Sequence, residues 1–142
     1  MRKKIKILCF SLFFLSLCWV LPGCAQKTGI SLSSENQIAQ AFQKGESNFF
    51  VESKGTVEKL LSDDEKGSRH QRFLLRLNNG HVILIAHNID LAPRVDLLKA
   101  GDEVSFRGEY EWNNKGGVVH WTHYDPKGRK GGWLEHGGHR YQ

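Results

Sequence analysis

Hydrophobic and polar residues follow three different patterns along the chain. Residues 7–21 form an uncharged apolar run that is preceded by four basic residues and no acidic one. Residues 34–45 carry apolar side chains three and four positions apart, which is the period of an amphipathic helix. From residue 49 onward, apolar and polar positions alternate, as they do in strands with one buried face. The pattern predicts a leader, one short helix and a domain made mainly of strands.

The apolar leader has the composition of an export signal. It is short for a membrane span, because about 30 Å of hydrocarbon requires about 20 helical residues, and its basic start is typical of a secretory signal peptide. Leu21-Pro22-Gly23-Cys24 resembles the lipobox of bacterial lipoproteins, although Pro22 departs from the usual small residue. We therefore expect residues 1–23 to be a signal peptide and Cys24 to be lipidated. Ordinary cleavage after Ala25 is the alternative.

The cysteines agree with this interpretation. All three lie at or before position 24, so the folded part contains none and relies on its core for stability. Residues 24–34 are small and polar and are expected to tether the lipid to a single domain, residues 35–142. Because Ala25 rather than Asp follows the lipidated cysteine, we expect an outer-membrane protein that faces the periplasm. A soluble periplasmic or secreted protein is the alternative.

The predicted helix has recognisable ends. Ser34 and Gln37 have the spacing of a capping box, and Gly45 is suited to a left-handed C-cap. The apolar stripe between these ends consists of Ile38, Ala41 and Phe42.

The strand pattern predicts a small barrel. The expected strands are residues 49–61, 71–77, 82–87, 104–112 and 118–124. Gly55 predicts a bulge or bend within the first strand, and Asn79-Gly80 favours a hairpin turn. Residues 89–100 fit one or two helical turns. Five strands with a helical connection between the third and fourth are the order of an OB-type barrel. A generic five-stranded sheet with a helix packed on it is the alternative.

The last segment, residues 125–142, lacks periodicity but carries large apolar side chains. Trp133, Leu134 and Tyr141 would be unusual in a disordered tail. We expect an ordered arm that lies across the barrel.

Several segments combine polar and aromatic residues in an unusual way. They are RHQRF at 69–73, AHNIDLAPR at 86–94, GEYEWN at 108–113, KGGV at 115–118, HWTH at 120–123, DP at 125–126 and GWL at 132–134. Together they resemble an uncharacterised family of small exported bacterial proteins, a domain of unknown function. The resemblance implies a single exported domain and transfers no catalytic assignment.

Seven histidines, none of them before residue 70, are the most informative polar feature. His120, His123 and Asp125 offer the groups that bind Zn²⁺ and similar divalent ions. Residues three apart on a regular strand face opposite sides, so both imidazoles can share an ion only if the strand ends or twists there. Solvated surface histidines without a metal are the more ordinary explanation, since the spacing matches no strong zinc signature.

A second group of polar residues lies where the second strand begins and the third ends. His70 and His87 are expected to be neighbours across the hairpin, with Arg69 or Arg72 close by. Histidine beside arginine suits anion binding or acid–base work on a phosphodiester, although such residues also brace loops. The candidate catalytic residues are His70, His87, His120 and His123. The candidate ligand-binding residues are Arg69, Arg72, Asn88, Arg94, Trp121 and Trp133.

Charge argues against nucleic acid as a partner. Removing the four basic residues of the leader from the net charge of +5 leaves +1, whereas proteins that bind polyanions usually carry a marked basic excess. The sequence therefore favours a non-catalytic envelope module that binds an unidentified ligand in a cleft of histidine, arginine and aromatic residues. The alternative is a small histidine-dependent hydrolase, such as a phosphodiesterase or nuclease, with or without a metal ion.

Overall fold

All five predicted strands form, but the fifth, predicted over residues 118–124, ends at His120. A computed structural model describes residues 33–128 and 131–142; the predicted signal peptide, Cys24 and most of the tether lie outside the described residues. In chain order the elements are α1 (Ser34–Lys44), β1 (Phe49–Leu60), β2 (His70–Leu77), β3 (Val82–Asn88), β4 (Glu103–Glu111), β5 (Val118–His120), β6 (Trp133–His136) and β7 (His139–Tyr141).

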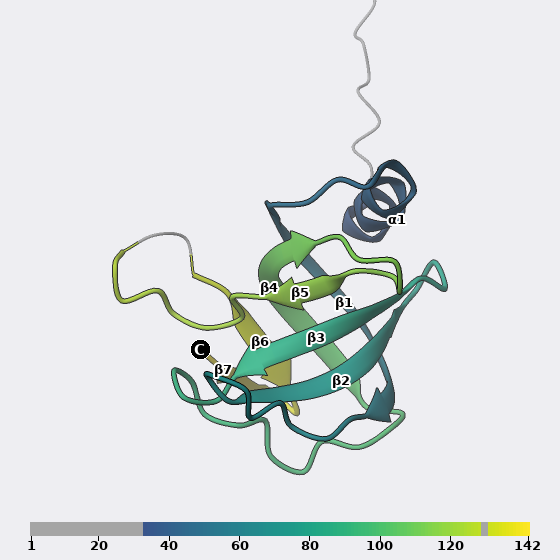
Figure 1. The fold of residues 1–142 in the computed structure, drawn as a ribbon. Coiled ribbons are helices and arrows are strands. Elements are labelled where there is room, and N and C mark those ends of the chain that lie inside the picture. Colours follow the sequence, from purple (N-terminus) through teal and green to yellow (C-terminus); the bar gives the residue numbers. More distant parts are fainter. Residues whose placement is uncertain (1–32, 129–130) are drawn as a thin grey trace, which may run out of the picture. The chain divides into compact units, whose positions relative to one another are not determined.

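The first five strands close into a barrel (Figure 1). They follow the order β1-β2-β3-β5-β4, and β4 pairs with β1 to complete the circuit. The β3–β5 pair is parallel and the others are antiparallel. This closure confirms the OB-like barrel and excludes an open sheet.

β1 is shared between two neighbours. It pairs with β4 from Phe49 to Thr56 and with β2 from Gly55 to Leu60. At Gly55 a Cβ would lie 2.4 Å from the carbonyl oxygen of Arg76, so only glycine fits where the strands approach. The register shift lies further along, between Val57 and Lys59.

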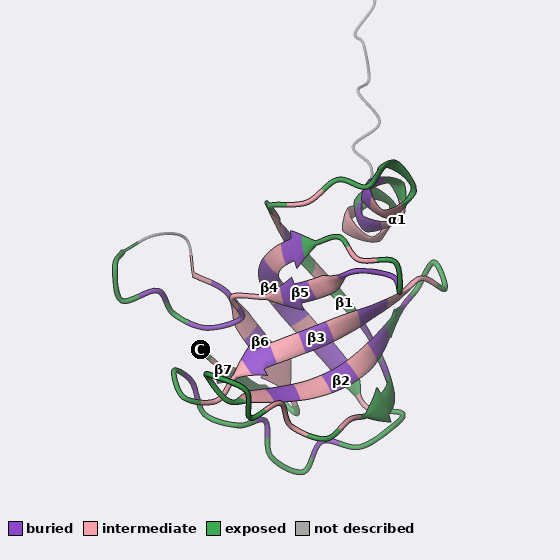
Figure 2. Cartoon of the chain, viewed as in Figure 1, coloured by how far each residue is buried: buried purple, intermediate pink, exposed green. Residues whose placement is uncertain are grey.

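The core follows the alternation (Figure 2). Val104, Phe106 and Tyr110 of β4 face inward and are fully buried, as the pattern predicts. Trp112 follows the last residue of β4 and is 41% exposed, although its alternation with Tyr110 in the predicted strand 104–112 indicates an inward position. Its indole N–H instead donates to the carbonyl of Phe42 at the end of α1.

The helix begins one residue earlier than its sequence signals indicate. Ser33 is the N-cap and makes no side-chain capping bond, so the predicted capping box from Ser34 to Gln37 is wrong. Gly45 has φ +71° and ends the helix in the left-handed conformation, as predicted. Within the described residues, no helix has the length and apolar character needed to cross a membrane.

The connection between β3 and β4 contains turns, and the predicted helical turns are absent. Val95 is buried, and both its N–H and its C=O bond to the side-chain amide of Gln71 on β2, at 2.9 and 3.0 Å. These bonds occupy the groups that a helix would need. Leu97, two residues on, is 92% exposed and has φ +55°.

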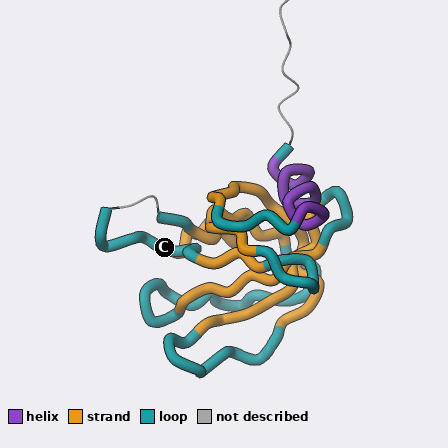
Figure 3. Tube along the Cα trace, turned by 45° about the horizontal axis from the view of Figure 1, so that its top comes forward, coloured by secondary structure: helices purple, strands orange, loops and turns teal. Residues whose placement is uncertain are grey.

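The C-terminal arm is a hairpin that extends the sheet. β4 pairs with β6 through Ser105–Arg107 and with β5 through Glu109–Glu111, so the two strands share one edge of β4. The His136 imidazole also lies 2.9 Å from the Asp102 carboxylate. This confirms the predicted ordered arm. Figure 3 shows α1 near one end of the barrel and a group of loops at the other.

Candidate functional site

A pocket at the end of the barrel opposite α1 brings together five of the predicted site residues. Its volume is about 210 Å³, and it lies between the β1–β2 loop, the end of β3 and the segment after β5. Its lining residues are Ser68, His70, Asn88, Leu91, His120, Trp121 and His123. We call this the histidine pocket.

The backbone at Trp121 explains why two histidines three residues apart share the pocket. β5 ends at His120, and Trp121 has φ +53°, a left-handed conformation that aromatic residues rarely adopt. The strand therefore stops and turns, so that His120 and His123 line the same cavity. Such strain is often found at functional sites, and the indole of Trp121 lies between the two rings, 6.5 and 5.2 Å away between centroids.

Two imidazoles are oriented by backbone carbonyls. Nδ1 of His70 lies 2.7 Å from the carbonyl oxygen of Ser68, and Nδ1 of His123 lies 2.8 Å from that of Tyr124. A carbonyl oxygen only accepts, so both Nδ1 atoms carry a proton, and in the neutral form of each ring Nε2 keeps its lone pair. Among the described residues no buried side-chain nitrogen lacks a partner. Both Nε2 atoms bond no described residue and therefore reach the pocket's solvent, although His123 as a whole is only 3% exposed.

His87 lies behind the pocket and is fully buried. Its Nε2–H donates to the carbonyl of Pro93 at 3.0 Å, so its Nδ1 accepts the hydroxyl proton of Thr122 at 2.8 Å. Burial lowers the pKa of His87, and the nearby charges of His123 and His70 act in the same direction. With both nitrogens engaged, this imidazole joins β3, the β3–β4 connection and the segment after β5.

Close backbone packing holds the segment after β5 in place. A Cβ on Gly108 would lie 2.5 Å from the carbonyl oxygen of His120. A Cβ on Gly132 would lie 2.1 Å from the carbonyl oxygen of Trp121 and 2.2 Å from that of Arg107. The N–H of Gly132 also donates to the carbonyl of His123 at 2.9 Å. The two glycines therefore let the pocket wall lie directly on β4.

The three predicted arginines do not line the histidine pocket. Arg69 bonds Asp90 through its backbone N–H and its guanidinium, at 2.7 and 2.8 Å, and these bonds lower the pKa of Asp90. Arg72 donates two bonds to the carbonyl of Ser62, and Arg94 pairs with Asp63, which raises the pKa of Arg94. The guanidinium groups brace loops around the pocket.

The predicted metal ligands are only partly brought together. His120 and His123 share the pocket, but Asp125 is buried and caps the backbone N–H of Lys127 at 2.9 Å. In the described part of the chain, no three histidine, cysteine or acidic residues are arranged to hold a metal ion. Trp133 lies outside the pocket, on β6, with the Arg140 guanidinium 4.1 Å from its ring centroid.

Two residues that support the site were missed in the sequence. Gln71 falls on the inward phase of β2, among Phe73, Leu75 and Leu77, and a polar residue in an apolar phase is a detectable signal of a buried hydrogen bond. Thr122 gave no comparable signal, because its role depends on the turn at Trp121.

These features define a small OB-like β-barrel protein with a histidine-lined pocket at one end. The chain belongs to the family described as "Protein of unknown function (DUF3465)", whose model matches residues 20–142. No curated protein matches the chain. The family confirms the resemblance inferred from the sequence segments and brings no activity with it.

Proposed function

We propose that the domain is a non-catalytic module that binds a small polar ligand in the histidine pocket. The observation that carries this proposal is the pair of oriented imidazoles, His70 and His123, whose Nε2 atoms remain accessible beside Trp121. Asn88 accepts the N–H of Asp90 at 3.0 Å through Oδ1, so its amide N–H groups remain as donors. The ligand then offers hydrogen-bond donors to the imidazoles and an acceptor to Asn88.

One feature of the histidine pocket also favours a second candidate function, hydrolysis. Two imidazoles in one pocket are the minimum for a general acid and base. A phosphodiesterase, however, needs a cation to stabilise the transferred phosphate, and Arg69, Arg72 and Arg94 are engaged in loop contacts. The geometry therefore supports binding better than hydrolysis.

Binding in the pocket is tested by titrating the ¹⁵N-labelled protein with amino acids, monosaccharides and nucleosides while the imidazole and indole resonances are recorded. For a molecule that binds, His123→Gln should weaken affinity roughly three- to tenfold, the value of one hydrogen bond. His139→Ala, on the exposed β7, is the matched control and should leave affinity unchanged. The proposal would be contradicted if the ligands bound the His123→Gln variant as tightly as the unchanged protein, or if none of the compounds bound. Phosphodiesterase activity that disappears in His123→Gln would establish the hydrolase instead.

We also propose that the protein is an exported lipoprotein anchored at Cys24. The basic leader, its apolar run and the Leu-x-Gly-Cys segment support this proposal. Cys24→Ser is expected to abolish labelling with palmitate and to release mature protein from the membrane fraction or leave the precursor uncleaved. Cys18→Ser, within the leader, is the control and should label normally. A Cys24→Ser chain that still labels would overturn the anchor.

A further inference from the structure

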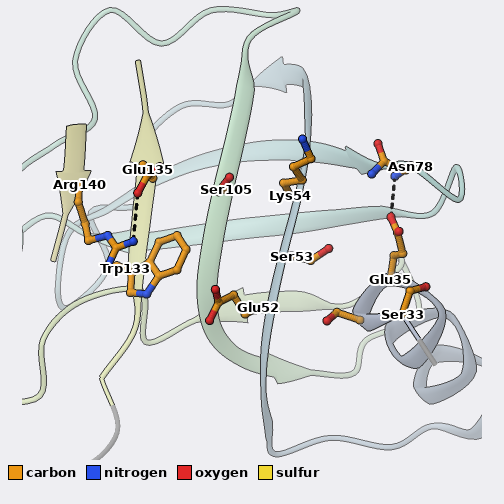
Figure 4. Close-up of a pocket in the computed structure, with 11 residues that line it drawn as sticks. Ser33, Glu35, Glu52, Ser53, Lys54, Asn78, Ser105, Trp133, Glu135 and Arg140 are labelled. Atoms are coloured by element: carbon orange, nitrogen blue, oxygen red, sulfur yellow. Dashed lines mark hydrogen bonds and ion pairs between the residues drawn. The ribbon is translucent and has the colours of Figure 1, made fainter. Parts of the chain in front are cut away.

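A second hollow, separate from the histidine pocket, crosses the barrel on β6, β4 and β1. Figure 4 shows it running from Trp133 and Arg140, past Ser105 and Glu52, to Glu35 at the first turn of α1. Its volume is about 540 Å³. Neighbouring strands lie about 4.8 Å apart, so a groove across three strands and the helix end suits an elongated ligand. We call it the β1–β4–β6 groove.

Trp133 is the aromatic end of the groove. Its side chain is half-buried, and the Arg140 guanidinium, itself held by Glu135 at 3.1 Å, lies over the ring. Because Trp133 also lines the groove, part of the indole faces that space. The face of an aromatic ring is electron-rich and attracts C–H groups that carry partial positive charge.

Most charged side chains of the groove are already paired. Lys54 lies 3.2 Å from Glu103, and Glu52 lies 3.5 Å from Arg107. At the other end, the Glu35 carboxylate accepts the backbone N–H of Asn78 at 3.2 Å. The basic side chains of the groove are therefore already paired and Glu35 adds a carboxylate without a cationic partner among the described residues, so the groove favours an uncharged ligand over a polyanion.

The groove also contains neutral hydroxyl groups that are not engaged in hydrogen bonds with described residues. Ser33, Ser34, Ser53 and Ser105 line the groove, and none of their side chains forms a hydrogen bond with another described residue. Since the described residues include no buried side-chain oxygen without a partner, these hydroxyls are open to solvent. Each can donate one bond and accept two.

We propose that the β1–β4–β6 groove binds a neutral oligosaccharide. A sugar ring presents a face of C–H groups, which fits the indole of Trp133, and a rim of hydroxyls, which fits the serine hydroxyls and the carboxylates of Glu52 and Glu135. The ligand lies across the strands with one ring on Trp133 and the next rings over β4 and β1. The groove shares no lining residue with the histidine pocket, so this proposal does not depend on the function proposed for the pocket.

The test is a titration of the ¹⁵N-labelled exported protein with chitotriose, cellotriose and maltotriose, followed through the indole N–H resonance of Trp133. At least one trisaccharide should shift this resonance. Trp133→Ala should weaken binding roughly tenfold, and Ser105→Ala should weaken it roughly three- to tenfold through one lost hydrogen bond. Tyr124→Ala, which removes an exposed aromatic side chain that lines neither pocket, is the matched control and should bind normally.

The outcomes separate the two sites. If none of the three sugars shifts Trp133, or if sugars bind Trp133→Ala and Ser105→Ala as tightly as the unchanged protein, the groove proposal is overturned. A response confined to His123 and Trp121 would also overturn it, while supporting the histidine pocket. Ser105→Ala removes one hydroxyl from a partly exposed position, so it keeps the comparison valid even if Trp133→Ala fails to fold.

Discussion

Gly132→Ala is expected to destabilise the domain by about 3 kcal/mol, the upper end of the usual cost of overpacking. The added Cβ would lie 2.1 Å from the carbonyl oxygen of Trp121 and 2.2 Å from that of Arg107. Both neighbours are backbone atoms, which cannot rotate away as a side chain can. The segment after β5 must therefore lift off β4, which also breaks the bond from Gly132 to His123.

Urea unfolding followed by circular dichroism measures this effect. Gly138→Ala is the matched control, because Gly138 has φ +80° in the exposed β6–β7 turn and an added Cβ meets nothing within 4 Å. Its cost should be only that of the left-handed conformation, roughly 1 to 2 kcal/mol. Equal losses for the two variants would show that the close approach at Gly132 does not constrain the pocket wall.

Acidification below about pH 6.5 is expected to destabilise the fold through His87. Burial lowers the pKa of this imidazole from its ordinary 6.5. The unfolded chain therefore binds the proton first, and the stability that neutral His87 contributes is complete above pH 6.5 and falls as pH drops toward the folded pKa. For one proton the loss reaches at most about 1.4 kcal/mol per pH unit.

His87→Gln tests this linkage, because glutamine can still donate to Pro93 but cannot titrate. The variant should be less stable at pH 8 and should lose much less stability than the unchanged protein between pH 6.5 and 5. The carboxylates with lowered pKa values, Asp90 and Asp102, are held down first by the backbone N–H groups of Arg69 and Lys99. Because the fold lowers both pKa values from the ordinary 3.8, these two carboxylates lose their contribution to the folding stability only at a lower pH than His87 does. An unchanged pH slope in the variant would contradict the role of His87.

The fold was largely predictable, because alternation reports directly on which side of a strand is buried. Phe73, Leu75 and Leu77 lie inward as their spacing indicates, and the predicted five strands occur in the predicted order. Errors arose where a tertiary contact decides local structure. Residues 89–100 lack helical turns because the Gln71 amide takes the backbone groups of Val95, and a contact between distant residues leaves no local periodicity.

The candidate site was predictable in residue type but not in arrangement. Five residues that the sequence predicts for the site line one pocket: His70, Asn88, His120, Trp121 and His123. Nothing in their spacing indicated that Trp121 adopts a positive φ, although this conformation brings His120 and His123 to the same side.

For the arginines, the sequence provides the residue type but does not indicate the partner. Arginine suits an anionic ligand and a loop carboxylate equally well, so the sequence could not assign Arg69 or Arg94 to either. The partners Asp90 and Asp63 lie 21 and 31 residues away, and only the folded loops bring them together.

Taken alone, the sequence determined the alternating strands, their order, the helix end at Gly45 and the family. These properties follow from local periodicity, local backbone preference and motif content. The tertiary structure alone decided that His87 is a buried support, that two imidazoles keep Nε2 accessible, and that Trp133 lies in a separate groove. Each of these depends on which distant backbone groups lie within bonding distance, and barrel closure sets those distances.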